Sequence, residues 1–140
     1  MLLHIIARGK IGRSSEAELV ERYLKRIAWP TKMTELPDRG GTVPPSVPNS
    51  ITIALDERGE ALSSMTLAKK LEDWRDTGKR EARFLIGAAD GHGEAGRAEA
   101  DLLLSFGPAT WPHLLVRAML AEQLFRATSI LANHPYHRDG

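Results

Sequence analysis

Cysteine is missing from this chain of 140 residues. Its absence excludes disulfide bonds, thiolate zinc sites and cysteine nucleophiles. A strong excess of one charge is missing as well, because 19 basic and 18 acidic residues leave a formal net charge of +1. A free-standing nucleic-acid binder is typically far more basic than this. Any contact with RNA must therefore be local, or be assembled between subunits.

The chain also lacks an uncharged apolar run long enough to cross a membrane. Four polar or charged residues interrupt the apolar stretch at 114–131: Arg117, Glu122, Gln123 and Arg126. The first residues, Met1 to Ile6, have the character of a strand and lack the basic flank and cleavable apolar segment of a secretory signal. We therefore expect a cytoplasmic protein.

What the chain does contain is an alternation of short apolar runs and helical periodicities. The apolar runs predict strands at 2–7, 32–36, 50–55, 82–86 and 102–106. Helical spacing predicts helices at 15–27, at 64–74 after a cap at Ser63 or Ser64, at 94–100 and at 112–131. The pattern predicts one domain, residues 1–140, of α/β class, with a mainly parallel sheet and helices on both faces.

Three segments that directly follow predicted strands are candidates for a binding site, because ligands bind beyond the carboxyl ends of parallel strands. They are the turn after Leu55, the loop from Gly87 to Gly91 and the segment from Phe106 to Trp111. Each of them alone could be a plain turn. Together they favour one shared pocket.

A glycine pattern at Gly91 to Gly96 has the spacing of a dinucleotide-binding fingerprint, G-x-G-x-x-G. That fingerprint must directly follow a strand and needs an acidic residue about 20 positions further on. Here the strand ends at Ile86, and the downstream stretch is the apolar start of the last helix. The context therefore argues against a nicotinamide or flavin site.

The carboxyl-terminal tail carries the densest polar cluster: His134, Tyr136, His137 and Arg138. Two histidines three positions apart could bind a metal, but Pro135 breaks the helical register and no carboxylate pattern completes a site. An aromatic ring, a guanidinium and imidazoles that titrate near neutrality suit a nucleic acid or a phosphate. The alternative is a solvated tail.

Five segments in series carry a resemblance to a known family: L-D-E-R-G at 55–59, F-L-I-G-A-A-D-G at 84–91, L-S-F to T-W-P-H at 104–113, E-Q-L-F-R-A at 122–127 and N-H-P-Y-H-R at 133–138. Together they resemble the ribosomal RNA large-subunit pseudouridine-N3 methyltransferases, a small single-domain branch of the SPOUT (trefoil-knot) superfamily. The resemblance extends from about Ser50 to the end of the chain.

The resemblance implies an α/β trefoil knot on the carboxyl-terminal side and an obligate homodimer. It implies S-adenosylmethionine as cofactor, and from the tail residues we expect no metal. The implied reaction is methylation of N3 of a pseudouridine in an inter-subunit stem-loop of large-subunit ribosomal RNA, on the assembled ribosome. The partners would thus be a second copy of the chain and that RNA within the ribosome.

Residues are carried over by position within these segments. The implied cofactor contacts are Leu55, Gly87, Phe106, Gly107, Pro108, Ala109, Thr110 and Trp111. The implied substrate-binding residues are His134, Tyr136 and Arg138. Two positions depart from the family pattern, since Ala88 replaces a second glycine and Pro108 removes an amide donor.

The chemistry requires alignment of a nitrogen, a methyl carbon and a sulfur, and the imide nitrogen must lose a proton. We assign His137 as the proton acceptor, Tyr136 as the group that orients or stacks on the base, and Arg138 as an electrostatic clamp. His134 has a structural role in this hypothesis. Scattered cations could add a basic surface: Lys10, Arg13, Lys25, Arg26, Lys32 and Arg80.

Three other interpretations remain open. The same chemistry could act on another RNA, such as transfer RNA. The chain could be a non-catalytic RNA-binding factor in ribosome assembly, or a flavodoxin-like nucleotide-binding module that uses residues 91–96.

The last helix raises a question of geometry. A helix of about twenty residues is roughly 30 Å long, so the segments at its two ends cannot meet along one straight helix. Either the tail folds back, or it completes the pocket of a partner subunit. The helix is apolar over much of its circumference, which fits either a central core helix or burial against a second subunit. We favour the partner subunit in both cases.

Overall fold

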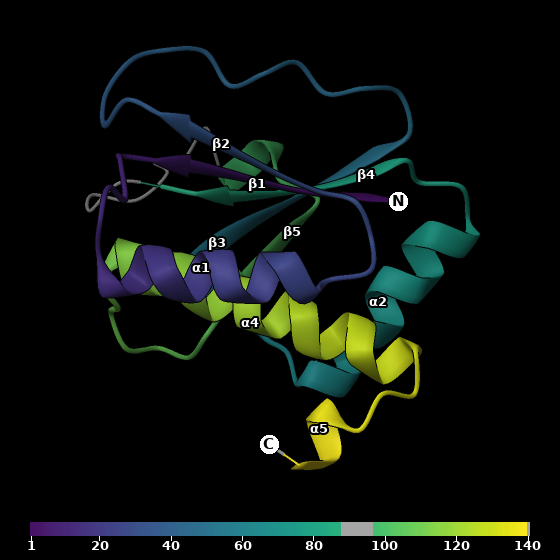
Figure 1. Cartoon of the computed structure of the whole chain (residues 1–140). Helices are drawn as coiled ribbons and strands as arrows, with labels where there is room; N and C mark the ends of the chain where they lie inside the picture. The colour runs from purple at the N-terminus through teal and green to yellow at the C-terminus, as the bar shows by residue number, and fades with distance from the viewer. Residues whose placement is uncertain (88–96, 140) are drawn as a thin grey trace.

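The computed structural model describes residues 1–87 and 97–139, which contain a parallel sheet of five strands (Figure 1). The strands are β1 (Leu2–Arg8), β2 (Thr31–Leu36), β3 (Ser50–Ala61), β4 (Glu81–Ile86) and β5 (Leu102–Ser105). The helices are α1 (Ser15–Arg26), α2 (Ser64–Asp76), α4 (His113–Leu131) and α5 (Tyr136–Asp139). The alternation of strands and helices confirms the predicted α/β class.

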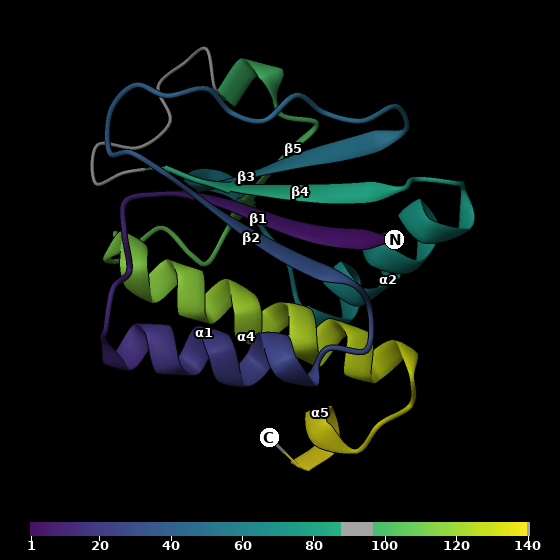
Figure 2. The ribbon, with the colours of Figure 1, turned by 45° about the horizontal axis from the view of Figure 1, so that its top comes forward.

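The strands lie in the order β2-β1-β4-β3-β5, and every neighbouring pair is parallel. The helical cover of this sheet is uneven. Helices α1, α2 and α4 lie on one side, whereas the other side carries the 37–49 segment and a helical turn at 97–99 (Figure 2). Nearly all residues of β1 and β4 are buried, as expected for strands that are covered on both faces.

Strand β3 does not end at Leu55, as the sequence predicted, but continues to Ala61. It pairs with β5 on both sides of a bulge, because Leu104 faces Leu55 and then Glu60. The polar residues 56–59 are therefore part of an irregular strand and not of a turn. Gly59 lies against β5 so closely that an added Cβ would be 2.5 Å from the backbone of Leu103. A glycine is required here for the close approach of two backbones.

Local capping explains where the first two helices begin. The Ser63 side chain accepts a hydrogen bond of 3.0 Å from the Thr66 amide, which confirms the cap predicted for α2. For α1 the capping residue is Ser14 and not Ser15, since the Ser14 hydroxyl accepts from the Ala17 amide at 3.1 Å. The helix start itself is where the sequence predicted it.

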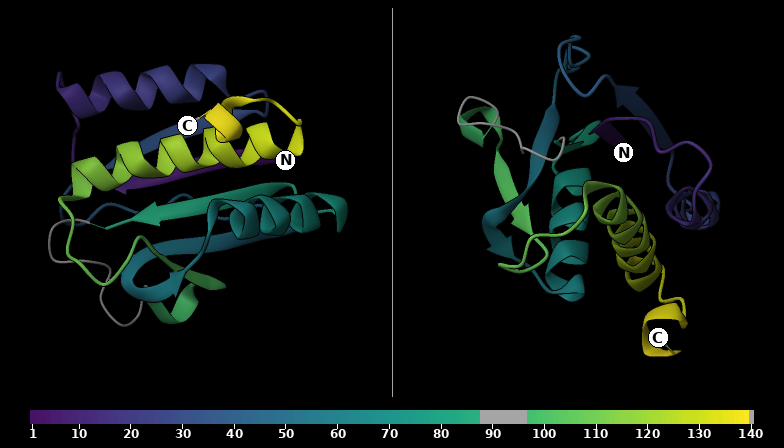
Figure 3. Two further views of the ribbon diagram at one scale, coloured as in Figure 1. Left: turned by 90° about the horizontal axis from the view of Figure 1, so that it is seen from below. Right: turned by 90° about the vertical axis from the view of Figure 1, so that its left-hand side faces the viewer.

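Helix α4 is a central core helix of the chain. It lies between α1 and α2 (Figure 3, right), and its buried residues include Leu120, Leu124 and Ala127. Neighbours within the same chain therefore bury much of its apolar surface. Leu115 and Met119 stay partly exposed, so burial of the remaining apolar surface against a second subunit stays a prediction.

Some predictions lie outside the described residues. They concern Ala88, the end of the Gly87 to Gly91 loop and the Gly91 to Gly96 pattern. Within residues 1–87 and 97–139, no helix has the length and apolar character needed to cross a membrane.

Candidate active site

The three segments predicted to hold a cofactor meet at the carboxyl edge of the sheet. Leu55 in β3 pairs with Ile86 of β4 on one side and with Leu104 of β5 on the other. Gly87 follows Ile86 directly, and Phe106 lies two positions beyond Leu104. Side-by-side parallel strands thus bring together residues that are far apart in sequence. Whether these residues contact a cofactor stays a prediction.

The 106–111 loop has a defined shape because side chains outside it hold its backbone. The Ser105 hydroxyl accepts from the Gly107 amide at 3.0 Å and donates to the Gly107 carbonyl at 2.8 Å. Gly107 has a φ of +105°, a conformation that side chains other than glycine rarely tolerate. The Thr110 hydroxyl donates to the Glu57 carboxylate at 2.8 Å. Glu57, in the bulge of β3, thereby ties the far end of the loop to the sheet.

Much of this loop faces solvent, which leaves its groups available to a ligand. Residues 108–111 are exposed, and Trp111 has 42% of its surface accessible. The Trp111 indole donates to the Phe106 carbonyl at 3.3 Å and so closes the loop on itself. Pro108 contributes no amide donor, so the amides of Ala109, Thr110 and Trp111 are the donors at the exposed end.

The tail is redirected at the end of α4 by Asn133. Asn133 has a φ of +56°, and the His134 amide donates to the Ser129 carbonyl at 2.8 Å. These features form a left-handed helix end. The His134 ring then accepts from the Tyr136 amide at 3.1 Å, and the structural role assigned to His134 stays a prediction.

The tail folds back onto its own helix, the alternative that we did not favour (Figure 3, left). The Tyr136 hydroxyl donates to Glu122 Oε1 at 3.2 Å. The Tyr136 ring centroid lies 4.5 Å from that of Phe125 and 4.8 Å from Arg126 Cζ. Tyr136 is therefore held through both its ring and its hydroxyl, and stacking on a substrate base requires this contact to open.

Glu122 is the anchor of this cluster. Its carboxylate accepts from Arg126 Nε at 2.8 Å and pairs with Arg126 Nη2 at 2.6 Å. Burial raises the pKa of the Tyr136 phenol to about 12, with further contributions from a hydrogen bond with Tyr23 and from the negative charge of Glu122. The hydrogen bond with Glu122 also raises the pKa of Arg126. Tyr136 is thus a donor at neutral pH and not a base.

His137 and Arg138 differ in what they contact. Arg126 Nη1 lies 3.2 Å from His137 Nδ1. Because arginine can only donate, this His137 nitrogen accepts and is unprotonated in that contact. Arg138 is exposed, and across residues 1–87 and 97–139 its guanidinium has no hydrogen bond or ion pair. Arg138 is therefore free to bind an anion.

A groove between α1 and α4 leads from the loop toward the tail cluster. Its lining residues belong to α1, α4 and the start of the 106–111 loop: Leu19, Tyr23, Phe106, Leu115, Ala118, Met119, Glu122 and Gln123. Phe106 and Glu122 thus share one groove, and Glu122 in turn binds Tyr136. The groove thus connects the 106–111 loop with the residue that holds Tyr136 of the tail.

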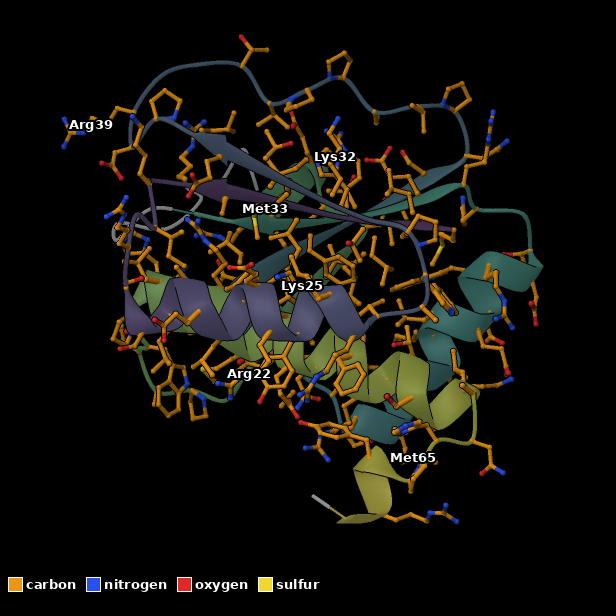
Figure 4. The ribbon with its side chains drawn as sticks, viewed as in Figure 1. Arg22, Lys25, Lys32, Met33, Arg39 and Met65 are labelled. Atoms are coloured by element: carbon orange, nitrogen blue, oxygen red, sulfur yellow. The ribbon has the colours of Figure 1, made fainter. Side chains whose placement is uncertain are left out.

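Two of the residues predicted to form a basic surface lie on different elements. Figure 4 shows Lys25 on α1 and Lys32 on the edge strand β2, at separate places on the molecule. Lys25 is paired with Glu21 at 2.7 Å, with both side chains mostly exposed. An exposed pair of this kind contributes little to stability and partly neutralises the surface.

Sequence reasoning missed the roles of Glu57, Glu122 and Arg126. Glu122 and Arg126 were part of a quoted segment, and their spacing of four residues on a helix is the signal of an ion pair. No local signal identifies Glu57, because its partner Thr110 is 53 positions away. Among residues 1–87 and 97–139 no group of three or more histidine or acidic side chains could hold a metal ion.

A family model described as "Predicted SPOUT methyltransferase" matches residues 1–137. The chain belongs to this SPOUT methyltransferase family.

Its similarity to particular relatives extends over the full length of each chain. It is 69% identical to "Ribosomal RNA large subunit methyltransferase H" of Rhizorhabdus wittichii, with 100% of both chains covered. It is 71% identical to the protein of the same name in Novosphingobium aromaticivorans, again with 100% of both chains covered. The Paramagnetospirillum magneticum protein of that name is 45% identical, with 99% of both chains covered.

A solved structure supports the fold alone. It is "The structure of a probable methylase family protein from Haemophilus influenzae Rd KW20", with a TM-score of 0.60 and 10% sequence identity. The match covers 94% of this chain and 66% of that chain.

Proposed function

We propose that this methyltransferase uses S-adenosylmethionine to methylate N3 of a pseudouridine in an inter-subunit stem-loop of large-subunit ribosomal RNA, on the assembled ribosome. The proposal depends mainly on one observation, which is that Leu55, Gly87 and Phe106 lie together at one edge of the sheet. The relatives' printed name, ribosomal RNA large subunit methyltransferase, supports the class of substrate. The same proposal implies action in the cytoplasm, where such ribosomes are found.

The residues at this edge fit the cofactor chemically. Leu55 is 8% exposed and Phe106 is partly buried, so both offer apolar surface to an adenine ring or a methionine chain. The exposed backbone at 109–111 offers donors and acceptors that suit the polar edge of adenine. When bound, S-adenosylmethionine supplies an electrophilic methyl group, and the chain's own residues orient it and exclude water.

In this proposal His137 accepts the N3 proton of the pseudouridine at Nδ1. That nitrogen is unprotonated in the contact with Arg126, so it can take a proton once the contact opens. Arg138 stabilises the negative charge of the deprotonated imide or of a neighbouring phosphate. Tyr136 leaves Phe125 and orients the base.

The homodimer and the trefoil knot are part of the same proposal. The exposed Trp111 and the groove that contains Met119 lie on the side formed by α1, α4 and the 106–111 loop. An apolar surface at this place suits a second copy, which could bring its own tail to the loop. Analytical ultracentrifugation and activity assays over the same concentrations test the dimer. A chain that sediments as a monomer at low concentration and keeps full activity there would refute it.

The reaction is tested by mass spectrometry of ribosomal RNA. Ribosomes from a strain that lacks this gene are incubated with the purified protein and S-adenosylmethionine. We expect one methylpseudouridine to be restored in the large-subunit RNA. A methyl group found on transfer RNA instead, or none at all, would contradict the assigned substrate.

A further inference from the structure

Arg117 is the largest fully buried side chain in the described part of the chain, with 0% of its surface exposed. It lies in the second turn of α4, where the sequence suggested only an interruption of an apolar face. Removing a guanidinium from water is costly unless it is paired. The contacts of Arg117 therefore indicate what it does.

The guanidinium binds the carboxyl ends of two neighbouring strands. Arg117 Nη1 lies 2.5 Å from Glu35 Oε2 at the end of β2. Its Nη2 donates to the carbonyls of Gly9 at 3.1 Å and Arg8 at 3.3 Å, at the end of β1. One side chain thus joins α4 to the carboxyl ends of β1 and β2.

Glu35 completes this junction. Its carboxylate also accepts from the Ile11 amide at 2.8 Å, in the loop before α1. Burial alone would raise the pKa of Glu35, but the Ile11 hydrogen bond and the Arg117 charge together lower it. Glu35 is therefore an anion at neutral pH and neutralises the buried cation.

The beginning of α4 has no local support of its own. Its capping position is Pro112, with no side-chain hydrogen bond, and no acidic residue occupies its first turn. A helix that starts without a cap is positioned by tertiary contacts. The next residue, His113, packs on the same junction, since a Cβ at Gly9 would be 3.4 Å from its ring.

The 106–111 loop ends directly before this helix start. Its first half is held by Ser105, and Thr110 is held by Glu57. The chain beyond Trp111 is held through His113 and Arg117. Arg117 is buried whereas Glu35 is exposed. Removing a guanidinium from water costs free energy that its partners must offset, so its presence here favours a role in geometry.

We propose that Arg117, neutralised by Glu35, is a positioning residue that fixes the 106–111 loop at the carboxyl edge of the sheet and thereby sets the affinity for S-adenosylmethionine. This proposal rests on the proposed function for the identity of the ligand. The positioning itself does not depend on that ligand, because the junction is formed within the chain.

The test compares two acidic residues, each paired with a buried arginine, at opposite ends of the sheet. Glu35→Gln removes the charge that pairs with Arg117 and keeps the volume of the side chain. Glu81→Gln is the control for the loss of a carboxylate beside a buried arginine, because Glu81 Oε1 lies 3.5 Å from Arg83 Nε and also 2.7 Å from His4 Nδ1. Glu81 is at the start of β4, and Gly87 follows the other end of that strand.

Two measurements are made on the full chain. Hydrogen–deuterium exchange without ligand is expected to rise about tenfold in Glu35→Gln at the amides of Gly107 and Val116, which donate to the Ser105 hydroxyl and the Pro112 carbonyl, and to stay at the wild-type rate there in Glu81→Gln. Calorimetric titration with S-adenosylmethionine is expected to give a Kd about tenfold weaker in Glu35→Gln, which corresponds to about 1.4 kcal/mol, and an unchanged Kd in Glu81→Gln. Arg117→Lys keeps the positive charge but lacks the planar guanidinium with its several donors. We expect the same changes in exchange and in Kd as in Glu35→Gln.

Wild-type exchange at the amides of Gly107 and Val116 in both Glu35→Gln and Arg117→Lys would overturn the positioning role. An equal rise in Glu81→Gln would also overturn it, because the effect would then follow from lost stability. If the wild-type chain does not bind S-adenosylmethionine but the exchange results hold, the proposed function fails and the positioning role stands.

Discussion

Single residues in the tail are held in place by partners that the sequence alone did not identify. Tyr136 was assigned to orient or stack on a base, but its hydroxyl and its ring are both engaged on α4. His137 was assigned as a proton acceptor, and the nitrogen that could accept faces Arg126. The tail of this single chain is therefore held in an arrangement that must open before these residues can reach a substrate.

The interaction of Tyr136 with Glu122 makes a prediction about titration. In Glu122→Gln the negative charge beside the phenol is removed, so the pKa of Tyr136 is expected to fall from about 12 toward the ordinary value of 10.0. An absorbance titration of the phenols measures it, with Tyr136→Phe used to identify the signal. A pKa of Tyr136 that does not move would contradict the contact.

The same phenol affects stability in alkali. Because its pKa is raised in the folded state, its stabilising contribution is complete below about pH 10 and is lost as the pH rises toward about 12. We expect the free energy of unfolding of the wild type to fall across this window, and Tyr136→Phe to lack that part of the fall. Denaturant unfolding at a series of pH values measures both.

Substitution of Arg138 is expected to change the rate of methylation without changing the free energy of unfolding. Its side chain is exposed and has no partner within the described residues, so Arg138→Ala should change the free energy of unfolding by less than about 0.5 kcal/mol. The rate of methylation on ribosomes should fall by about a hundredfold, the typical cost of removing one group that stabilises a developing charge. Arg39→Ala, a change at another exposed arginine (Figure 4), is the control and should keep the rate. An unchanged rate in Arg138→Ala would remove Arg138 from the site.

At the scale of elements, the 106–111 loop is the part whose shape matters most to the proposal. Gly107 has a φ of +105°, and a side chain there costs about 1–3 kcal/mol in backbone strain. We expect Gly107→Ala to weaken S-adenosylmethionine binding about tenfold or more in calorimetry. Gly78→Ala is the matched control, because Gly78 has a φ of +93° at the end of α2 and open space for a Cβ. Equal affinity in the two variants would contradict a role for the loop in binding.

Strands and caps were predictable where the signal is local. The buried runs of β1 and β4 and the cap at Ser63 follow from apolar patterning and from short-range hydrogen bonding. The extension of β3 past Leu55 was not predictable, because residues 56–59 are polar and only the second pairing with β5 keeps them in the strand. The pairing with β5 therefore keeps residues 56–59 in a strand although their own strand propensity is low.

On the scale of the whole molecule, the parallel sheet explains why the candidate site could be predicted at all. Parallel strands place their exits at one edge, so Leu55, Gly87 and Phe106 could be grouped before any contact was known. The contact of Glu35 with Arg117 joins residues 82 positions apart. No local sequence pattern predicts such a contact. The sequence pattern also left open whether the tail folds back, which depends on the side-chain contacts of Tyr136 and on the left-handed Asn133.

We propose methyl transfer from S-adenosylmethionine to N3 of a pseudouridine in large-subunit ribosomal RNA. The most direct measurement uses methyl-labelled S-adenosylmethionine, the purified chain and assembled ribosomes from a strain without this gene, followed by digestion of the RNA and mass spectrometry of its nucleosides. We expect one labelled N3-methylpseudouridine in the large-subunit RNA, formed on assembled ribosomes. Label on a different nucleoside or in transfer RNA, or ribosomes left without label, would contradict it.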